Sequence, residues 1–227
     1  SCYRRFFRKP YRAEHRQRMD RQMSHEGILI VVSGFSGAGK GTLMKRLVEE
    51  YDDYALSISA TTRTPRTGEE NGREYFFLSR EQFEQKIADD ALIEYAEYCG
   101  NYYGTPRDYV ESELAKGRNV ILEIEIQGAL KIRKQYPNAL LLFVSTPSAK
   151  ELRRRLSGRG TETEEVIDRR LQRAAQEAEG IEEYDYIVIN DDLEACVKEL
   201  HEIIDAARHT PGRNMEFIEE MRKNLRE

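Results

Sequence analysis

The sequence lacks the features that would direct it into or across a membrane. Its longest apolar runs, residues 28–32 and 139–144, are far shorter than the roughly 20 residues that a membrane-spanning helix needs. A signal-peptide pattern of charged start, apolar core and small-residue cleavage site is also missing. Cys2, Cys99 and Cys196 are odd in number, widely spaced and in no CxxC or Cys/His cluster, so they indicate neither a disulfide framework nor a zinc site. We therefore expect a cytoplasmic protein that does not associate with membranes.

The sequence also lacks an overall excess of positive charge. Its formal net charge is -5 at pH 7, whereas a general nucleic-acid binder carries a basic excess on one face. We therefore do not expect nucleic acid as a partner. Only the first 21 residues depart from this balance, with eight Arg and Lys against two acidic residues. We expect residues 1–25 to be a disordered extension, and a basic arm that touches nucleic acid or an acidic surface is the alternative.

Apolar runs alternate with helical periods along most of the chain. The first pair is a strand over 27–33 and a helix over 40–51. Further strands are expected over 120–124, 139–145 and 186–189, with helices over 127–135, from 148, and over 193–207. This alternation is typical of a parallel sheet covered by helices, so the predicted fold class is α/β.

Two segments interrupt that alternation. Residues 60–105 contain turn residues, short aromatic strands and one helix, which indicates an insertion into the main domain. A polar, glycine-bearing stretch over about 156–166 lies between two helices and predicts a mobile lid. The main domain is expected to span 26–209, and residues 210–227 are expected to form a tail that ends in an amphipathic helix.

A glycine-rich segment follows the first strand and opens the first helix. This is the position of a phosphate-binding P-loop, whose amides point at phosphate oxygens with the helix dipole behind them. Lys40 is expected to neutralise charge on the outer phosphates of ATP as the phosphorus–oxygen bond breaks. A tight glycine turn in some other α/β protein is the alternative. The candidate ATP-binding residues are Gly34, Phe35, Ser36, Gly37, Ala38, Gly39, Lys40, Gly41 and Thr42.

The residue after the lysine departs from the strict P-loop pattern. That pattern has Ser or Thr there, whereas this chain has Gly41 followed by Thr42. Thr42 is therefore the candidate ligand for Mg²⁺, directly or through water.

Ordered motifs behind the P-loop resemble the guanylate kinases. They lie at residues 57–69, 71–77, 100–105, 155–165 and 190–192, and the resemblance runs from about residue 28 to residue 209. It implies a P-loop kinase fold with an α+β acceptor-binding insertion and a lid. It also implies transfer of the terminal phosphoryl group of ATP to GMP and dGMP, giving ADP and GDP in purine nucleotide metabolism, with Mg²⁺ as cofactor.

The resemblance assigns seven residues to GMP. Those for the phosphate are Arg63, Arg66, Tyr75 and Tyr103, and those for the base are Ser59, Glu94 and Thr105. Arginines suit a dianionic phosphate because they donate charge-assisted hydrogen bonds. A carboxylate flanked by hydroxyls suits guanine, which offers two donors, N1–H and the 2-amino group, beside the O6 acceptor. Adenine would turn a lone pair toward the same carboxylate. Taken singly, these residues are better explained as solvated loop charges and ordinary sheet residues. Taken as an ordered set at family spacing behind a P-loop, they favour a GMP site.

The resemblance also assigns residues to the donor side. Arg155, Arg159 and Arg170 match arginines that close over ATP and the moving phosphoryl group, and Asn190 matches a contact to the donor adenine. A basic helix face is the alternative for the arginines, with Arg169 as the rival of Arg170.

Three positions depart from the family pattern. Glu123 and Glu125 stand where the family has Asp-x-Asp, and they are expected to orient the acceptor and hydrated magnesium. Phe35 stands where proline is usual.

Two other functions fit a P-loop on this scaffold. The first is a P-loop kinase for another phosphorylated acceptor, which would not need the base-reading residues Ser59, Glu94 and Thr105. The second is a catalytically inactive guanylate-kinase-like binding module, which would not need Lys40 and the lid arginines. The sequence favours ATP and GMP as small-molecule substrates, and it leaves the oligomeric state open.

Overall fold

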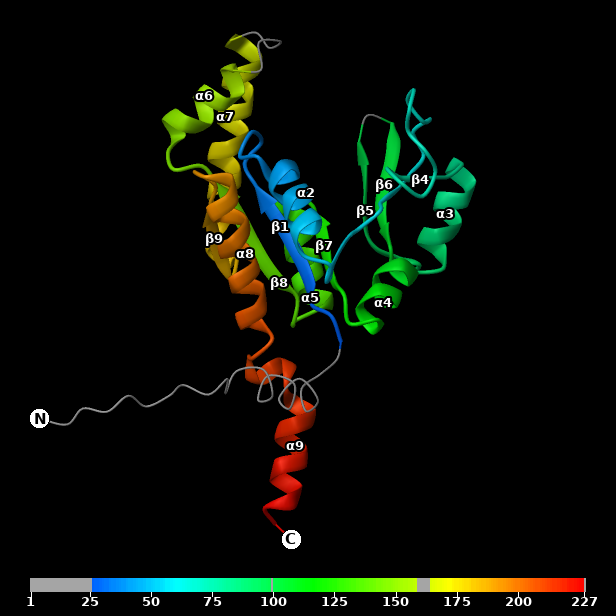
Figure 1. Cartoon of the computed structure of the whole chain (residues 1–227). Coiled ribbons are helices and arrows are strands. Elements are labelled where there is room, and N and C mark those ends of the chain that lie inside the picture. Colours follow the sequence, from blue (N-terminus) through cyan, green and yellow to red (C-terminus); the bar gives the residue numbers. More distant parts are fainter. Residues whose placement is uncertain (1–25, 99, 159–163, 227) are drawn as a thin grey trace, which may run out of the picture.

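The centre of the fold is a five-stranded parallel sheet (Figure 1). The computed structural model describes residues 26–98, 100–158 and 164–226. The strands of this sheet, in spatial order, are β2 (Tyr54–Leu56), β7 (Asn119–Glu123), β1 (Leu29–Gly34), β8 (Leu140–Ser145) and β9 (Tyr186–Ile189). Because β1 is the middle strand, its carboxyl end opens at the centre of the sheet edge, where open α/β folds bind ligands.

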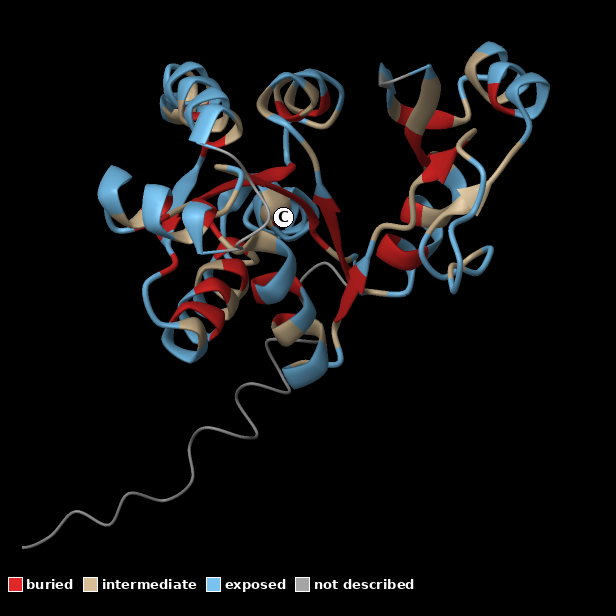
Figure 2. Ribbon diagram, turned by 90° about the horizontal axis from the view of Figure 1, so that it is seen from above, coloured by how far each residue is buried: buried red, intermediate tan, exposed pale blue. Residues whose placement is uncertain are grey.

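Helices cover both faces of this sheet, which confirms the predicted α/β class. They are α2 (Lys40–Glu50), α4 (Arg107–Ala115), α5 (Ile126–Gln135) and α8 (Leu193–Ala207). Two further helices, α6 (Ala149–Ser157) and α7 (Glu164–Ala178), pack on each other and on Phe35. Ile30 and Val32 of β1 pack with residues of α2 and α8, whereas Leu29 and Val31 pack with residues of α4 and α5. Successive side chains of a strand point to opposite faces, so a strand covered on both faces is apolar throughout. In Figure 2 the buried residues accordingly gather on the sheet and on the inner sides of the helices.

A second, smaller sheet stands beside the first (Figure 1). Its strands, in spatial order, are β4 (Phe76–Phe77), β3 (Ala60–Thr61), β6 (Asn101–Pro106) and β5 (Leu92–Tyr98), and α3 (Arg80–Ala88) packs against it. β5 and β6 form an antiparallel hairpin, β6 also pairs antiparallel with β3, and β3 pairs parallel with β4. A small core of Ala60, Phe83 and Leu92 joins α3 to these strands.

The chain leaves the main body after α8. A short 3₁₀ turn, η2 (Pro211–Arg213), leads into α9 (Met215–Asn224), which points away from the sheet at the end opposite the P-loop (Figure 1). Another 3₁₀ turn, η1 (Ile181–Glu183), precedes β9. Within the described ranges, no helix has both the length and the apolar character needed to cross a bilayer. The predicted basic extension and the centre of the predicted lid, including Arg159, lie outside the described residues.

Candidate active site

The loop between β1 and α2 approaches its neighbours too closely for side chains at two of its glycines. A Cβ on Gly34 would lie 2.1 Å from the backbone oxygen of Val144 in β8. Gly39, the N-cap of α2, has a φ of +87°, and a Cβ there would lie 2.6 Å from the side-chain nitrogen of Asn190. Glycine is therefore required for the loop to pass between β8 and Asn190, which leaves its amides at the start of α2 available to an anion.

Substitution of Gly34 by alanine is expected to lower the free energy of unfolding by more than about 3 kcal/mol, because the clash is with backbone. Gly41 is the matched control, since nothing lies within 4 Å of a Cβ built there. Gly41→Ala should leave stability unchanged or raise it by up to about 1 kcal/mol. Urea unfolding of both variants measures the difference, and equal stabilities would contradict the close approach of β1 and β8.

The side chain of Lys40 bonds to the backbone of the loop between β1 and α2. Its Nζ donates hydrogen bonds to the backbone oxygens of Gly34 at 2.7 Å and Phe35 at 3.2 Å. Burial lowers the pKa of the Lys40 ammonium, while the negative charges of Glu123, Glu177 and Glu125 act in the opposite direction. The lysine is thus a poorly hydrated cation, and such a cation interacts strongly with an incoming phosphate.

Two side chains brace this loop from outside. The side-chain amide of Asn190 donates to the backbone oxygen of Ala38 at 2.8 Å, and Asn190 is buried. The ring of Phe35 packs edge-to-face against Phe143 of β8, with ring centroids 5.0 Å apart. The residue in the usual proline position therefore ties the loop to the sheet, and Asn190 fixes the backbone that precedes Lys40.

A cavity of about 420 Å³ opens beside the loop at the carboxyl ends of β1 and β7. Its charged lining consists of Lys40, Glu123, Glu125, Arg170, Arg173 and Glu177. Three cations thus face three carboxylates around one opening. Arg170 lines this cavity, whereas Arg169, its rival in the sequence, is exposed and is not part of the lining.

Arg173 was not predicted from the sequence. Its guanidinium contacts the carboxylate of Glu125, and its Nε donates to Glu177 at 3.1 Å. Arg170, Arg173 and Glu177 follow one another at three- and four-residue spacing, so they lie on one face of α7. That spacing is the signal that could have found Arg173 and Glu177. The contact joins α7 to the N-cap of α5 beside the cavity.

The Arg173–Glu125 contact is expected to position the Glu125 carboxylate for the reaction. Arg173→Ala should raise KM for GMP several-fold, with a smaller effect on kcat. Arg173→Lys should restore part of the loss, because it keeps the charge. In a double-mutant cycle, Arg173→Ala should have much less effect once Glu125 is Gln. Additive effects of the two substitutions would contradict the coupling. Arg169→Ala, on the exposed side of α7, is the control.

The second sheet brings the predicted base-reading residues together. Glu94 of β5 is paired with Thr105 of β6, and the Thr105 hydroxyl donates to the Glu94 carboxylate at 2.8 Å. Thr105 is buried and Glu94 is partly buried. Burial raises the pKa of the Glu94 carboxyl. The hydrogen bond from Thr105 and the positive charge of Lys131 act in the opposite direction and lower it in part. Ser59 directly precedes β3, whose Ala60 pairs with Gly104, so it adjoins the same row.

The predicted phosphate-binding residues form a cluster on the same sheet. The guanidinium of Arg63 donates to both oxygens of Glu69 at 2.9 Å and lies 5.4 Å from the ring centroid of Tyr75. Tyr75 in turn packs edge-to-face on Tyr103, at 6.2 Å between centroids. Arg63 hydrogen bonding lowers the pKa of Glu69. Arg66 is exposed, and its backbone amide donates to the same carboxylate.

Of three further predicted residues, Arg155 and Thr42 do not line the cavity and Glu123 does. The Arg155 guanidinium pairs with Glu151 at 2.7 Å, one turn earlier on α6. Thr42 is exposed in the first turn of α2 and is not part of the cavity lining. Glu123 is exposed at the end of β7 and does line it.

A parallel sheet whose central strand runs through a glycine loop and a lysine into a helix, beside a charged cavity, defines a P-loop kinase. A family model described as guanylate kinase matches residues 26–207. The chain belongs to the guanylate kinase family.

Individual relatives agree with this membership. The chain is 51% identical over 184 residues to the guanylate kinase of Desulfitobacterium hafniense (strain Y51), covering 81% of this chain and 92% of the relative. It is 49% identical over 183 residues to the guanylate kinase of Bacillus subtilis (strain 168), covering 80% and 90%. The crystal structure of guanylate kinase from Anaplasma phagocytophilum is similar with a TM-score of 0.67 at 32% identity, covering 88% of this chain and 97% of that chain. These findings do not support the two alternative functions.

Proposed function

We propose how the residues of this site divide the work of ATP-dependent GMP phosphorylation, the activity to which the family membership assigns this chain. Donor phosphates would bind the amides of residues 34–42. Lys40 would exchange the backbone oxygens of Gly34 and Phe35 for phosphate oxygens. Arg170 would neutralise charge on the moving phosphoryl group from across the cavity. Arg155 and Arg159 would join it when the lid closes, which requires Arg155 to leave Glu151.

The main support for GMP as the acceptor is the hydrogen bond between Glu94 and Thr105. A partly buried carboxylate, already oriented by a hydroxyl, accepts from the two guanine donors and mispairs with adenine. Arg63, Arg66, Tyr75 and Tyr103 would hold the GMP phosphate, with Arg63 leaving Glu69. The attacking phosphate oxygen is already ionised at neutral pH, so the transfer depends on alignment and charge neutralisation and needs no strong general base.

Mg²⁺ is proposed to accompany ATP. The described residues include no preformed cluster of His, Cys, Asp or Glu that could hold a metal ion. This fits a magnesium ion that is bound mainly by substrate phosphates and water, with one or two carboxylates nearby. Glu123 and Glu125, which line the cavity, are the residues that would orient its water shell, and Thr42 would contact the phosphates or that shell. A bound Mg²⁺ supplies charge neutralisation on the donor phosphates.

We also propose that residues 26–209 form one domain, within which residues 60–105 act as the acceptor-binding part and about 156–166 as the lid. The second sheet and the charged cavity would approach each other when both nucleotides bind. Small-angle scattering should then report a smaller radius of gyration with both nucleotides than with either alone. An unchanged radius would contradict the closure. We place the reaction in the cytoplasm, where the free thiol of Cys196 would remain reduced.

A coupled assay of ADP release tests the acceptor assignment. With ATP and magnesium, GMP should be phosphorylated, dGMP should also react, and AMP, UMP and CMP should react much more slowly. Equal turnover of GMP and AMP would contradict the role of Glu94. Folded protein without activity on any of these nucleotides would contradict catalysis altogether.

A further inference from the structure

Helix α9 carries apolar side chains that the described part of the structure leaves largely exposed. None of its residues is buried. Met215, Phe217 and Met221 are 40–45% exposed, and Leu225, just beyond its last turn, is 80% exposed. Figure 1 shows the helix standing clear of the sheet. A lone helix of 10 residues is marginal in water, so packing against a partner would stabilise it.

The apolar residues of α9 lie on one side of the helix. At 3.6 residues per turn, Met215, Phe217, Ile218, Met221 and Leu225 fall on about half of its circumference. Glu216 and Lys223 lie in the middle of the opposite, polar side. An apolar stripe of this width is typical of a helix that packs against another apolar surface.

The order of charges along α9 identifies the partner. Outside the middle of the polar side, the acidic residues Glu219 and Glu220 come first, and the basic residues come last, Arg222 within the helix and Arg226 just beyond its end. When the same helix from a second copy is turned end for end, the acidic half of each lies beside the basic half of the other. A parallel arrangement would set acidic half beside acidic half. The helix dipole also favours this order of charges, but it does not explain the apolar side.

We infer that α9 pairs antiparallel with α9 of a second copy of this chain, about a twofold axis. Met215 then lies opposite Leu225 of the second copy. Glu219, which pairs with Arg222 of its own helix, also lies beside Arg222 of the second copy. Such an interface is isologous and closes at the dimer. Because α9 and the P-loop lie at opposite ends of the sheet, both nucleotide sites stay open (Figure 1).

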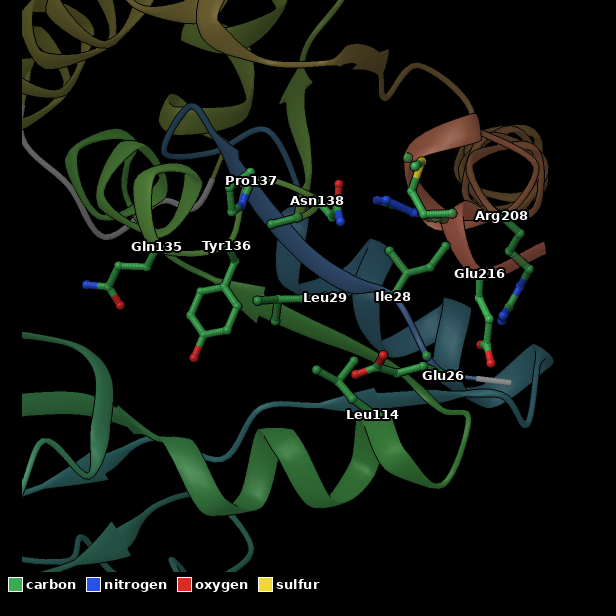
Figure 3. A pocket seen from close by; sticks show the side chains of 15 residues that line it. Glu26, Ile28, Leu29, Leu114, Gln135, Tyr136, Pro137, Asn138, Arg208 and Glu216 are labelled. Carbon is green, nitrogen blue, oxygen red and sulfur yellow. The ribbon is translucent and has the colours of Figure 1, made fainter. Parts of the chain in front are cut away.

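A second cavity at the foot of α9 extends this surface. It measures about 440 Å³ and is lined by Ile28, Leu29 and Leu114 together with Met215 and Glu216 (Figure 3). The apolar side of α9 is therefore continuous, at Met215, with further apolar side chains. A pair of helices only about 15 Å long is smaller than a standard interface, so we expect a dimer that dissociates in the micromolar range.

Sedimentation velocity of the full chain tests this pairing. Between about 1 µM and about 100 µM the wild type should pass from monomer to dimer. Met221→Glu combined with Leu225→Glu should stay monomeric throughout, with unchanged turnover of GMP per chain. Lys223→Gln, on the polar side, should behave as the wild type. A wild type that stays monomeric would overturn the inference, and so would its capture by anionic phospholipid vesicles without dimerisation.

Charge exchange tests the partner and the direction independently of any loss of folding. Glu219→Lys with Glu220→Lys makes α9 basic, and Arg222→Glu with Arg226→Glu makes it acidic. Each variant alone should be monomeric at concentrations where the wild type is dimeric, and an equimolar mixture should form a heterodimer. Failure of the mixture to associate, with both variants active on GMP, would overturn the pairing.

Discussion

Replacement of Lys40 by methionine is expected to lower kcat for GMP phosphorylation by about three orders of magnitude, with a smaller change in KM. The methionine keeps most of the side-chain volume and removes the charge. That charge is partly desolvated and lies beside the loop amides, so its attraction to the developing charge on the phosphates is weakly screened. No other side chain of the loop carries a positive charge, and Arg170 lines the same cavity from α7.

Lys45→Met is the matched control for this experiment. Lys45 lies on the same helix, its side chain is 76% exposed, and its pair with Glu49 is long, at 3.9 Å. Its loss should change kcat by less than about twofold, since exposed ion pairs of this kind contribute little. Both variants should unfold at similar urea concentrations. A Lys40→Met enzyme that keeps more than about a tenth of wild-type turnover would contradict the proposed role of the ammonium.

Glu94→Gln is expected to lower kcat/KM for GMP by about three to four orders of magnitude. A glutamine can still accept from Thr105, but its amide presents N–H groups where the guanine base also presents donors. On binding, the N–H groups of the glutamine and of guanine would be buried without acceptors, and burying unpaired donors costs binding free energy. Glu97→Gln on the same strand is the control, because Glu97 is exposed. Steady-state kinetics with GMP would contradict the base-reading role if both substitutions had equal effects.

The same substitution has a predictable effect on pH dependence. Burial raises the pKa of the Glu94 carboxyl above its ordinary value of 4.5. Since only the carboxylate accepts from guanine, KM for GMP should rise as the pH falls through that raised pKa, and Glu94→Gln should lose this dependence.

The raised pKa also means that ionised Glu94 destabilises the unliganded fold. The contribution of Glu94 to the free energy of unfolding is fully present below the ordinary pKa and is lost as the pH rises through the raised pKa. At pH 7 the Glu94→Gln variant should therefore unfold at a higher urea concentration than the wild type.

The parts of the fold that depend on local pattern were predicted well. The predicted ranges 186–189 and 193–207 coincide with β9 and α8, and the P-loop helix was predicted to within one residue. The first strand begins two residues later than predicted, because the amide of Ile28 donates to the side chain of Asn119 in β7 rather than to the backbone of a neighbouring strand. β2, only three residues long, has no period to detect and exists because it pairs with β7.

The site was predictable to different degrees for a similar reason. The P-loop is contiguous, so its motif and its neighbours in the sequence were enough to find it. Glu94 and Thr105 came from family resemblance alone, since their contact depends on the register of β5 against β6. Arg173 was missed because its role depends on how α7 lies against the start of α5. The donor-side role of Arg155 stays a prediction, since its guanidinium is paired with Glu151.

The central place of β1 also constrains the order in which the protein can fold. β1 is the first strand of the main sheet, but its partners β7 and β8 follow roughly 90 and 110 residues later. Gly34 and Phe35 cannot take their places until β8 has been synthesised, whereas the strands and helix of residues 60–106 are local in sequence. Such long-range pairing makes folding slow. During synthesis the second sheet can form first, and the loop between β1 and α2, although it precedes that sheet in the sequence, is completed among the last parts of the enzyme.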